Sequence, residues 1–373
     1  MIPSLHRPAT VEINMDNLKY NLDNELQQVP QGTDVFAVVK ANAYGHGLVK
    51  VAKAEIQYGA TGLCVATLDE GIEIRDAGVI APILVLGITP ASYAEIANKA
   101  DISLTVGSLD WLKEAAKQDI YQLKIHLAVD SGMGRIGFRH HEDLIEASQY
   151  IKDNPNLFIP EGLFTHFATA DSPDEQYFEK QAAKFKEMKS NLPIDFRWIH
   201  CANSATALWH QDLAINMVRY GIALYGLNPS QTDIETLPFE LKPVLSLHSE
   251  LVFSKKVSAG ESIGYGATYT TDVPEWIGTV PLGYADGWLR RMSGFDVLIQ
   301  GQRYPIVGRV CMDQFMVKLP HDMPVGTKVT LIGKSGNEEI TATDVAEYAD
   351  TINYEILCCL AERLPRVYVS NRK

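Results

Sequence analysis

Short apolar runs rich in β-branched residues alternate with amphipathic stretches from about residue 35 to about residue 225. Such runs are typical of the strands of βα units. Eight can be counted, at residues 35–40, 62–67, 82–87, 101–106, 124–130, 159–167, 196–201 and 217–226. Thr67 and Ser108 precede acidic residues where two helical patterns begin, so each can cap the first N–H groups of a helix. A doubly wound sheet would also alternate in this way, but eight regularly spaced units favour a TIM-type (β/α)₈ barrel.

The pattern changes after about residue 240. Apolar runs within residues 244–257, 277–288, 296–319 and 327–336 are separated by Gly, Pro and Asp turns, and one helical stretch is predicted near residues 343–363. The α/β barrel is therefore expected to be followed by a mainly β C-terminal domain. We predict a boundary that gives the barrel residues 1–240 and the second domain residues 241–373, as suits a chain of this length.

Composition narrows the possible partners. The formal net charge of −13 would repel phosphate backbones and anionic lipid, so neither nucleic acid nor a membrane is expected, and a small molecule is. The five cysteines are odd in number, scattered and never spaced C-x-x-C, which argues against a disulfide framework and a zinc ribbon. The opening residues show no signal-peptide pattern, and no segment is apolar enough to span a bilayer. A cytoplasmic location without a metal is the expectation.

Candidate chemistry lies where the predicted barrel strands end, because that face of a barrel carries the functional loops. The polar residues near these ends are Lys40, Asp130, Arg135, Thr165, His166, Asn203, Ser204 and Arg219, with Gly221 following the last. Barrels often bind phosphate with the loops after strands seven and eight. Ser204 and Gly221 could present N–H donors there.

A lysine at the mouth, a phosphate cradle opposite it and an arginine between them are what pyridoxal 5′-phosphate (PLP) needs. Lys40 would hold its aldehyde as a Schiff base, and Arg219 would face its pyridine nitrogen. A lysine at a strand end is by itself more often a solvated charge, and His166 or His200 alone is more often a core histidine. Only their joint placement favours the PLP hypothesis.

The segment GMGRIG, residues 132–137, offers a rival interpretation because it matches the G-x-G-x-x-G fingerprint of dinucleotide sites. It lies in the fifth βα unit, however, and it contains Arg135. The acidic residue expected at the end of the next strand is missing, since Glu161 lies early in that strand. A nicotinamide-dependent dehydrogenase is therefore disfavoured.

Nine blocks of the chain resemble the alanine racemase family, which is PLP-dependent and of fold type III. They are AVVKANAYGHG, VDSGMGRIG, GLFTHFATAD, HCANSATAL, MVRYGIALYG, IGYGATY, LGYADGW, GRVCMDQFMV and TINYEI. They follow the family's order over nearly the whole length. The resemblance implies a homodimer with shared active sites that interconverts L-alanine and D-alanine and supplies D-alanine for peptidoglycan.

The resemblance also implies roles for individual residues. Lys40 matches the PLP lysine and one catalytic base, and Tyr265 of the partner subunit matches the other. The positions that match cofactor-binding residues are Tyr44, His166, Asn203, Ser204, Arg219, Gly221, Ile222 and Tyr354. Arg135 and Met312 match substrate-binding positions. Supporting positions are His200, which orients Arg219, and Tyr284, Arg309, Cys311 and Asp313.

One position departs from the family pattern. Many members have a carbamylated lysine two residues before the aspartate of VDSGMGRIG, and its negative charge helps to orient the arginine. Here that position is Ala128, so an anion, a water or another carboxylate would have to hold Arg135. A broader racemase that accepts serine, a related PLP decarboxylase and a non-catalytic PLP carrier remain as alternatives.

Overall fold

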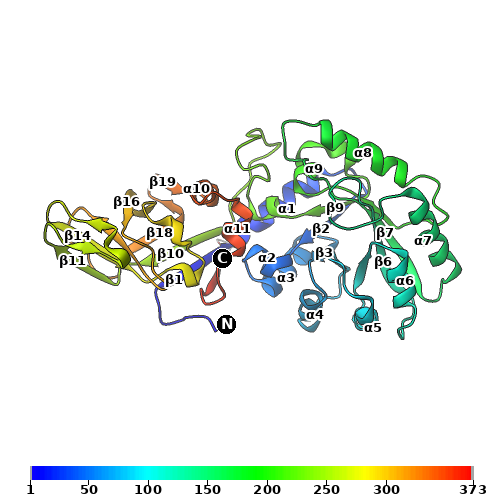
Figure 1. The fold of residues 1–373 in the computed structure, drawn as a ribbon, viewed down its shortest axis with the longest axis horizontal. Helices are drawn as coiled ribbons and strands as arrows, with labels where there is room; N and C mark the ends of the chain where they lie inside the picture. The colour runs from blue at the N-terminus through cyan, green and yellow to red at the C-terminus, as the bar shows by residue number, and fades with distance from the viewer. Residues whose placement is uncertain (1, 371–373) are drawn as a thin grey trace. The chain divides into compact units, whose positions relative to one another are not determined.

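The computed structural model describes residues 2–370. Two compact units are found in it (Figure 1). The barrel unit contains residues 18–43 and 47–242. The β unit contains the described residues up to 17, residues 44–46 and the described residues from 243 onward.

Eight parallel strands form the core of the barrel unit, as predicted. In the order β8-β7-β6-β5-β4-β3-β2-β9 they make one sheet, and a bridge between Ala202 and Val218 brings the β8 end to β9 and nearly closes it. Their bounds are β2 Asp34–Val38, β3 Gly62–Val65, β4 Ile83–Val85, β5 Ser103–Val106, β6 Leu123–Ala128, β7 Phe158–Phe164, β8 Trp198–His200 and β9 Met217–Tyr220. Most of their residues are buried, as is usual when both faces of a parallel sheet are covered.

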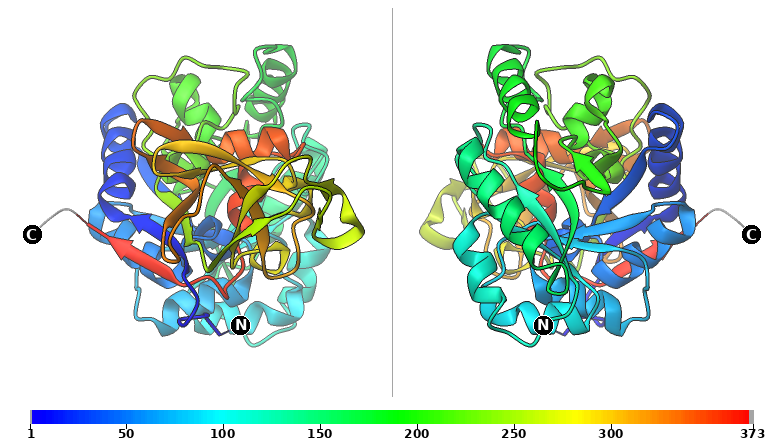
Figure 2. Two further views of the ribbon diagram at one scale, coloured as in Figure 1. Left: turned by 90° about the vertical axis from the view of Figure 1, so that its left-hand side faces the viewer. Right: turned by 90° about the vertical axis from the view of Figure 1, so that its right-hand side faces the viewer.

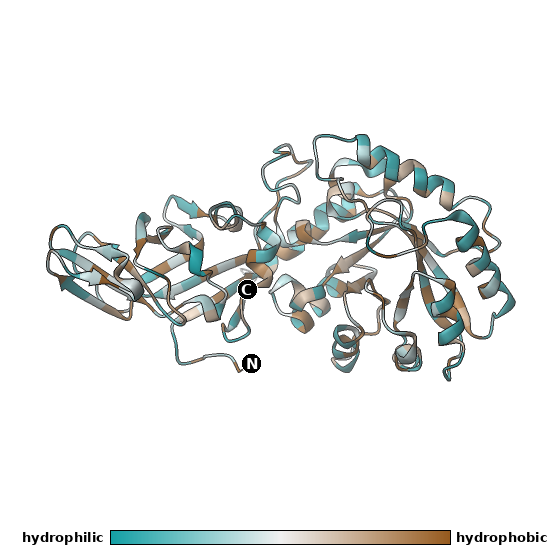
Figure 3. Cartoon of the chain, in the orientation of Figure 1, coloured by the Kyte–Doolittle hydropathy of each residue, from teal (hydrophilic) through white to brown (hydrophobic). Residues whose placement is uncertain are grey.

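Helices surround these strands (Figure 2). They are α3 Leu48–Tyr58, α4 Leu68–Asp76, α5 Ala94–Lys99, α6 Leu109–Ala115, α7 His141–Asp153, α8 Gln176–Met188 and the short α9 Ser204–Trp209, while α1 Met15–Gln28 begins in the β unit. Both predicted caps are confirmed: Thr67 accepts from the Glu70 N–H, and Ser108 accepts from the Trp111 N–H. In Figure 3 the strands of the barrel unit are rich in hydrophobic residues, whereas α7 and α8 are largely hydrophilic.

Three details of the barrel unit differ from the sequence-based expectations. The first predicted strand ends at Val38, and Lys40 begins a separate short turn. His166, expected within the sixth strand, follows the end of β7 at Phe164. The last predicted strand stops at Tyr220, and the 3-10 helix η3 Ile222–Tyr225 follows Gly221.

The β unit is built on a ten-stranded sheet with the order β11-β14-β17-β16-β15-β18-β10-β1-β20, to which β19 adds at β18. The strands are β1 Ala9–Asn14, β10 Leu245–Glu250, β11 Phe253–Val257, β14 Glu275–Val280, β15 Asp296–Ile299, β16 Gln302–Val307, β17 Phe315–Leu319, β18 Lys328–Ser335, β19 Glu338–Ile340 and β20 Arg366–Val369. A separate hairpin joins β12 Ser262–Ile263 to β13 Tyr269–Thr270. The single predicted helical stretch is divided into α10 Ala342–Tyr348 and α11 Asn353–Cys358.

The first strand of the chain belongs to this mixed sheet, although residues 1–240 were assigned to the barrel. β1 pairs antiparallel with β10 and parallel with β20. Its alternate residues Ala9, Val11 and Ile13 are buried, while those between them are half-exposed. A strand with one covered face suits the edge region of this sheet better than a barrel core that is covered on both faces.

Candidate active site

One cavity at the C-terminal ends of the barrel strands collects four of the predicted site residues. Lys40, Arg135, His166 and Arg219 line it, and its volume is about 260 Å³. The rest of its wall is apolar or small: Ala66, Leu86, Gly87, Ala128, Val129, Met133, Ile136 and Phe164. None of these lining residues, all within the described part of the chain, is acidic. Three cationic side chains facing an apolar wall therefore form a site suited to an anionic ligand.

Lys40 is held between the end of β2 and a turn of the opposite hand. Ala41, Asn42, Ala43 and Tyr44 have φ between +50° and +56°, in the left-handed region that L-residues avoid at a cost of roughly 1–2 kcal/mol each. The Glu70 carboxylate accepts from the Ala41 N–H at 2.7 Å, and Asn42 Oδ1 accepts from the Leu48 N–H at 2.8 Å. These local bonds help to maintain the strained turn, which gives the lysine a defined direction.

The end of this turn is fastened within the β unit. Arg366 donates its Nε–H to the Gly45 carbonyl at 3.0 Å, and the Tyr368 hydroxyl donates to the His46 carbonyl at 3.0 Å. A Cβ on Gly45 would lie 2.2 Å from the Leu357 carbonyl oxygen, so only glycine fits there. The rings of Tyr44 and Tyr354 are consequently 6.3 Å apart, and two of the predicted phosphate-binding residues come together.

A chain of hydrogen bonds runs from Arg219 into the barrel interior. Arg219 donates Nη1–H to His200 Nδ1 at 2.6 Å, and because a guanidinium only donates, the proton of His200 must lie on Nε2. His200 Nε2 is 2.9 Å from Nδ1 of His126, which must accept and so carries its own proton on Nε2. That N–H lies 3.3 Å from Oε2 of Glu161, which also accepts from the Ser103 hydroxyl. Both imidazoles thus have one defined tautomer.

The pKa values agree with this polarity. Burial lowers the pKa of His200 well below its ordinary value and also lowers that of His126, so both rings are neutral at neutral pH. Burial acts to raise the pKa of Glu161, but hydrogen bonds from His126 and Ser103 outweigh it and the pKa is lowered overall. Glu161 is therefore an anion that balances the buried Arg219 through two imidazole rings, as buried charges require.

Sequence reasoning missed His126 and Glu161 because their contact depends on an irregularity in the sheet. Between β6 and β7, Ile125 pairs with Pro160 and His126 with Gly162, so Glu161 is left over as a bulge. A bulge turns a side chain away from the direction that strand alternation predicts. Gly162 is needed as well, since a Cβ there would lie 2.1 Å from the His126 ring. A glycine beside an acid within a strand was the only available signal.

His166 faces the same cavity as a neutral ring. Burial, followed by the charges of Arg219, Arg135 and Lys40, lowers its pKa to about 3. Its Nδ1 lies 3.4 Å from Nη2 of Arg219, which can only donate. The proton of His166 therefore lies on Nε2 and can be donated to another group.

The residues after β8 and β9 are joined by backbone donors. Ser204 Oγ accepts from the Gly221 N–H at 2.8 Å and from the Ala223 N–H at 3.4 Å. The neighbouring Asn203 caps α9 by accepting from the Thr206 N–H at 2.9 Å. Ser204, Gly221 and the start of η3 at Ile222 therefore lie together, with N–H groups directed toward a single hydroxyl oxygen.

The N–H groups of the glycine-rich loop after β6 are bonded within the loop itself. Asp130 Oδ1 accepts from the N–H groups of Gly132 and Gly134, at 3.1 and 2.9 Å. A carboxylate in that position takes the donors that a dinucleotide fingerprint would offer to a phosphate. The loop instead brings Arg135 to the cavity.

The remaining predicted site residues belong to the β unit. Tyr265, Met312 and Tyr284 are 72%, 53% and 42% exposed. The Arg309 guanidinium lies against Gly266, where an added Cβ would be 3.0 Å from its Nη1. Cys311 and Asp313 flank Met312, and burial raises the pKa of the Cys311 thiol. This unit therefore presents its candidate residues on its surface.

The fold and the cavity together define a barrel enzyme with a lysine shortly after its first barrel strand and a mainly β second unit. Two family models match the chain: alanine racemase, N-terminal domain, over residues 13–229, and alanine racemase, C-terminal domain, over residues 244–368. The chain belongs to the alanine racemase family, whose members are isomerases.

Known racemases are similar to this chain in sequence and in fold over nearly its whole length. The alanine racemase of Ligilactobacillus salivarius is 56% identical over 371 residues, which are 99% of this chain and 100% of that protein. The crystal structure of alanine racemase from E. faecalis is 50% identical with a TM-score of 0.96, covering 99% of this chain and 100% of that one. A histidine racemase from Leuconostoc mesenteroides is 38% identical with a TM-score of 0.93, covering 99% and 100%.

Proposed function

We propose that this protein interconverts L-alanine and D-alanine with PLP as its cofactor. The observation that carries the proposal is the cavity lined by Lys40, Arg135 and Arg219 without an acidic residue, in a chain whose net charge is −13. Both PLP and an amino-acid carboxylate are anionic, so such a wall would attract both. The names of the relatives support alanine as the substrate.

The residues present fit PLP. Lys40 offers the amine for covalent attachment, and Arg219 offers a guanidinium to the ring nitrogen. The Ser204 hydroxyl oxygen accepts from the Gly221 N–H, which leaves its own hydrogen to donate to a phosphate. By family resemblance we assign Gly221, Ile222, Tyr44 and Tyr354 to the phosphate as well, and Asn203 to cofactor binding. When bound, PLP withdraws electrons from the α-carbon and so makes its hydrogen acidic.

Racemisation requires a base on each face of the α-carbon. We assign the Lys40 amine to one face and the phenol oxygen of the partner subunit's Tyr265 to the other. His166 would donate its Nε2–H to that phenol oxygen, which favours the deprotonated form. Because the low pKa of His166 keeps it neutral, it would position the tyrosine without competing for the substrate proton.

Arg135 would bind the substrate carboxylate together with Met312 of the partner subunit. Ala128, which also lines the cavity, leaves no carbamylated lysine to hold Arg135. Arg219 stays charged and would keep the ring nitrogen unprotonated, which limits transamination.

We further propose a homodimer, because Tyr265, Tyr284 and Met312 are exposed in the β unit while the cavity is lined by barrel residues alone. Around the passage to the site we assign supporting roles to Arg309, Cys311 and Asp313. D-alanine for peptidoglycan would be the product used by the cell. We place the enzyme in the cytoplasm, where the five cysteines, none of them disulfide-bonded, would stay reduced. Within residues 2–370, every helix is too short or too polar to span a bilayer.

The proposal is tested with purified protein and L-alanine in D₂O. Proton NMR should show loss of the α-proton signal, and chiral chromatography should show D-alanine. Purified protein with bound PLP should absorb visible light. Borohydride reduction should remove this absorbance and leave the cofactor attached to the peptide that contains Lys40. Carbon dioxide release without exchange would instead indicate a decarboxylase, and faster exchange of serine or histidine than of alanine would overturn the substrate assignment.

A further inference from the structure

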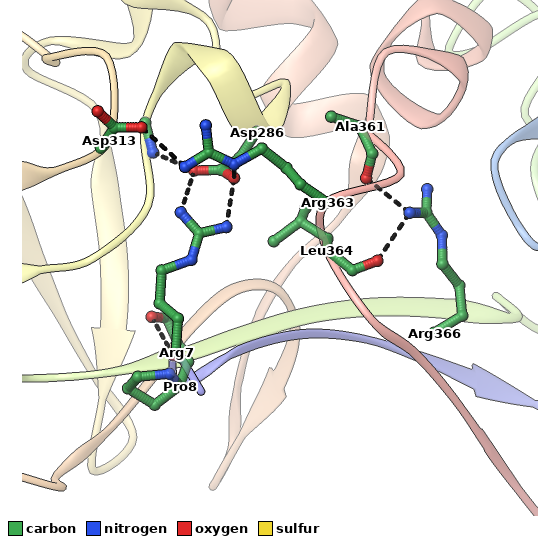
Figure 4. A network of polar contacts seen from close by, with 10 residues as sticks. Arg7, Pro8, Asp286, Asp313, Ala361, Arg363, Leu364 and Arg366 are labelled. Carbon is green, nitrogen blue, oxygen red and sulfur yellow. Dashed lines mark hydrogen bonds and ion pairs between the residues drawn. The ribbon is translucent and has the colours of Figure 1, made fainter. Parts of the chain in front are cut away.

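A cluster of ion pairs around the buried Asp286 joins segments of the β unit that are distant in the sequence. Asp286, in the 3-10 helix η5 Tyr284–Asp286, has a side chain with no exposed surface. Arg7 donates through both terminal nitrogens to its two oxygens, and Arg363 Nε lies 2.9 Å from one of them (Figure 4). The Gly283 N–H donates to the same carboxylate at 2.9 Å. The second arm of Arg363 reaches Asp313 at 2.7 Å.

The cluster is connected directly to the loop that carries Met312. The N–H groups of Tyr284 and Ala285 donate to the carbonyls of Cys311 and Met312, at 3.1 and 2.9 Å. A Cβ on Gly283 would lie 2.3 Å from the Cys311 carbonyl oxygen, so the two loops are in backbone contact. The loop that carries Met312 is therefore bonded through its backbone to the segment that carries Asp286.

The charges of the cluster balance, with two arginines against two aspartates. Burying ion pairs contributes little to stability, because the desolvation of each charge offsets most of the attraction. A bidentate arginine does, however, define the geometry of the carboxylate that it holds. The ion pairs around Asp286 therefore serve mainly to fix the geometry of the two loops. The exposed side chains on those loops need such support if they are to form part of a site.

We propose that Arg7, Asp286 and Arg363 are positioning residues that orient Met312 and Asp313 for the active site of the partner subunit. The inference rests on the proposed function, in which that site is shared. Arg7 precedes the first strand of the chain, far in sequence from every residue assigned to the site. The N-terminal segment of one subunit would thus control substrate binding in the other.

The first experiment compares Arg7→Met with Arg303→Met. Both remove one arginine of the β unit, but Arg303 pairs with Glu338 and the Glu339 carbonyl and contacts neither loop. Arg7→Met should raise the KM for alanine about tenfold with a change in kcat below about threefold, because Met312 is assigned to carboxylate binding. Arg7→Lys keeps the charge but loses the two-pronged guanidinium, so its KM should lie between those of the parent protein and Arg7→Met. An equal fall of kcat in both methionine variants with an unchanged KM would overturn the inference.

The second experiment uses mixed dimers. Chains with Lys40→Ala and chains with Tyr265→Ala, differently tagged and co-purified, should give a dimer with one working site, built from Lys40 of the second chain and Tyr265 of the first. Arg7→Met on the Lys40→Ala chain should raise KM, whereas on the Tyr265→Ala chain it should not. An effect from the Tyr265→Ala chain alone, or from both equally, would refute the inference.

Failure of the proposed function would give a different result, since the mixed dimer without Arg7→Met would then have no activity. If Arg7→Met chains do not assemble, Arg363→Gln is examined in the same pairing. It removes the ion pairs to Asp286 and Asp313 and leaves the fork of Arg7 in place. A KM that does not depend on which chain carries Arg363→Gln would equally refute the inference.

Discussion

The two units treat their site residues in opposite ways. In the barrel unit Arg219 is 3% exposed and is connected through buried histidines to Glu161, whereas in the β unit Tyr265 is 72% exposed. Buried groups with fixed tautomers are organised before any ligand arrives. Exposed groups gain a defined environment only when another surface covers them. The barrel unit therefore holds its candidate residues in place by itself, whereas the β unit leaves Tyr265 largely exposed.

The largest expected effect comes from the buried side of this comparison. Lys40→Ala removes both the covalent attachment point and one base, so racemisation should fall by at least about a thousandfold. Lys53→Ala, an exposed lysine of α3, is the matched control and should keep full activity. Coupled detection of D-alanine measures the rate, and retained activity in Lys40→Ala would contradict the barrel assignment.

The next effect tests the exposed side. Tyr265→Ala should slow α-proton exchange from one enantiomer about a hundredfold or more and spare exchange from the other, because only one face loses its base. Tyr304→Phe, which removes another tyrosine hydroxyl of the same unit, should change neither rate. NMR exchange rates for L-alanine and D-alanine measured separately decide the matter. Equal slowing of both would show that Tyr265 is not a base for one face.

Within the barrel unit, Glu161→Gln tests whether the Glu161 carboxylate compensates the positive charge of the buried Arg219. It should lower kcat and reduce the free energy of unfolding at pH 7 by about 1–3 kcal/mol, since Arg219 loses its counter-charge. The pKa of Glu161 is lowered in the fold, so its contribution is present above the unfolded value of 4.5 and is lost as pH falls through the folded pKa. Urea unfolding at pH 7 and pH 4 should show the variant closer to the parent at the lower pH.

Glu25 should show the opposite pH dependence of stability and the smallest effect on activity, because it does not line the cavity. It is fully buried in α1, neither carboxyl oxygen has a hydrogen-bond partner among the described residues, and burial raises its pKa to about 8. Its favourable contribution is therefore complete below pH 4.5 and is lost as pH rises toward 8. Each pH unit between the two pKa values corresponds to about 1.4 kcal/mol, so Glu25→Gln should stabilise the protein at pH 8 by roughly 3–4 kcal/mol relative to its effect at pH 5. Urea midpoints that fail to diverge with pH would contradict this.

How far the sequence predicted these features depends on how local their causes are. The eight strands could be predicted because runs buried on both faces form continuous apolar segments, and the cavity positions of Lys40 and Arg219 follow from strand ends. The bulge at Glu161 and the place of β1 could not, because each depends on pairing with residues far along the chain. The left-handed turn was missed because its unusual φ angles fall on Ala41 to Tyr44, a run without glycine, the residue that normally marks such a conformation in a sequence.

That turn has a consequence for chemical synthesis of the protein. A left-handed backbone is the relaxed conformation of a residue of D configuration. D-alanine would therefore adopt the backbone angles of Ala41 without strain. Its side chain is exposed, and moving the methyl group there would disturb no packing. A chain assembled by ligation with D-alanine at position 41 should gain roughly 1–2 kcal/mol of stability. The proposed product of the enzyme would then be a better building block for its own active-site turn than the residue that translation supplies.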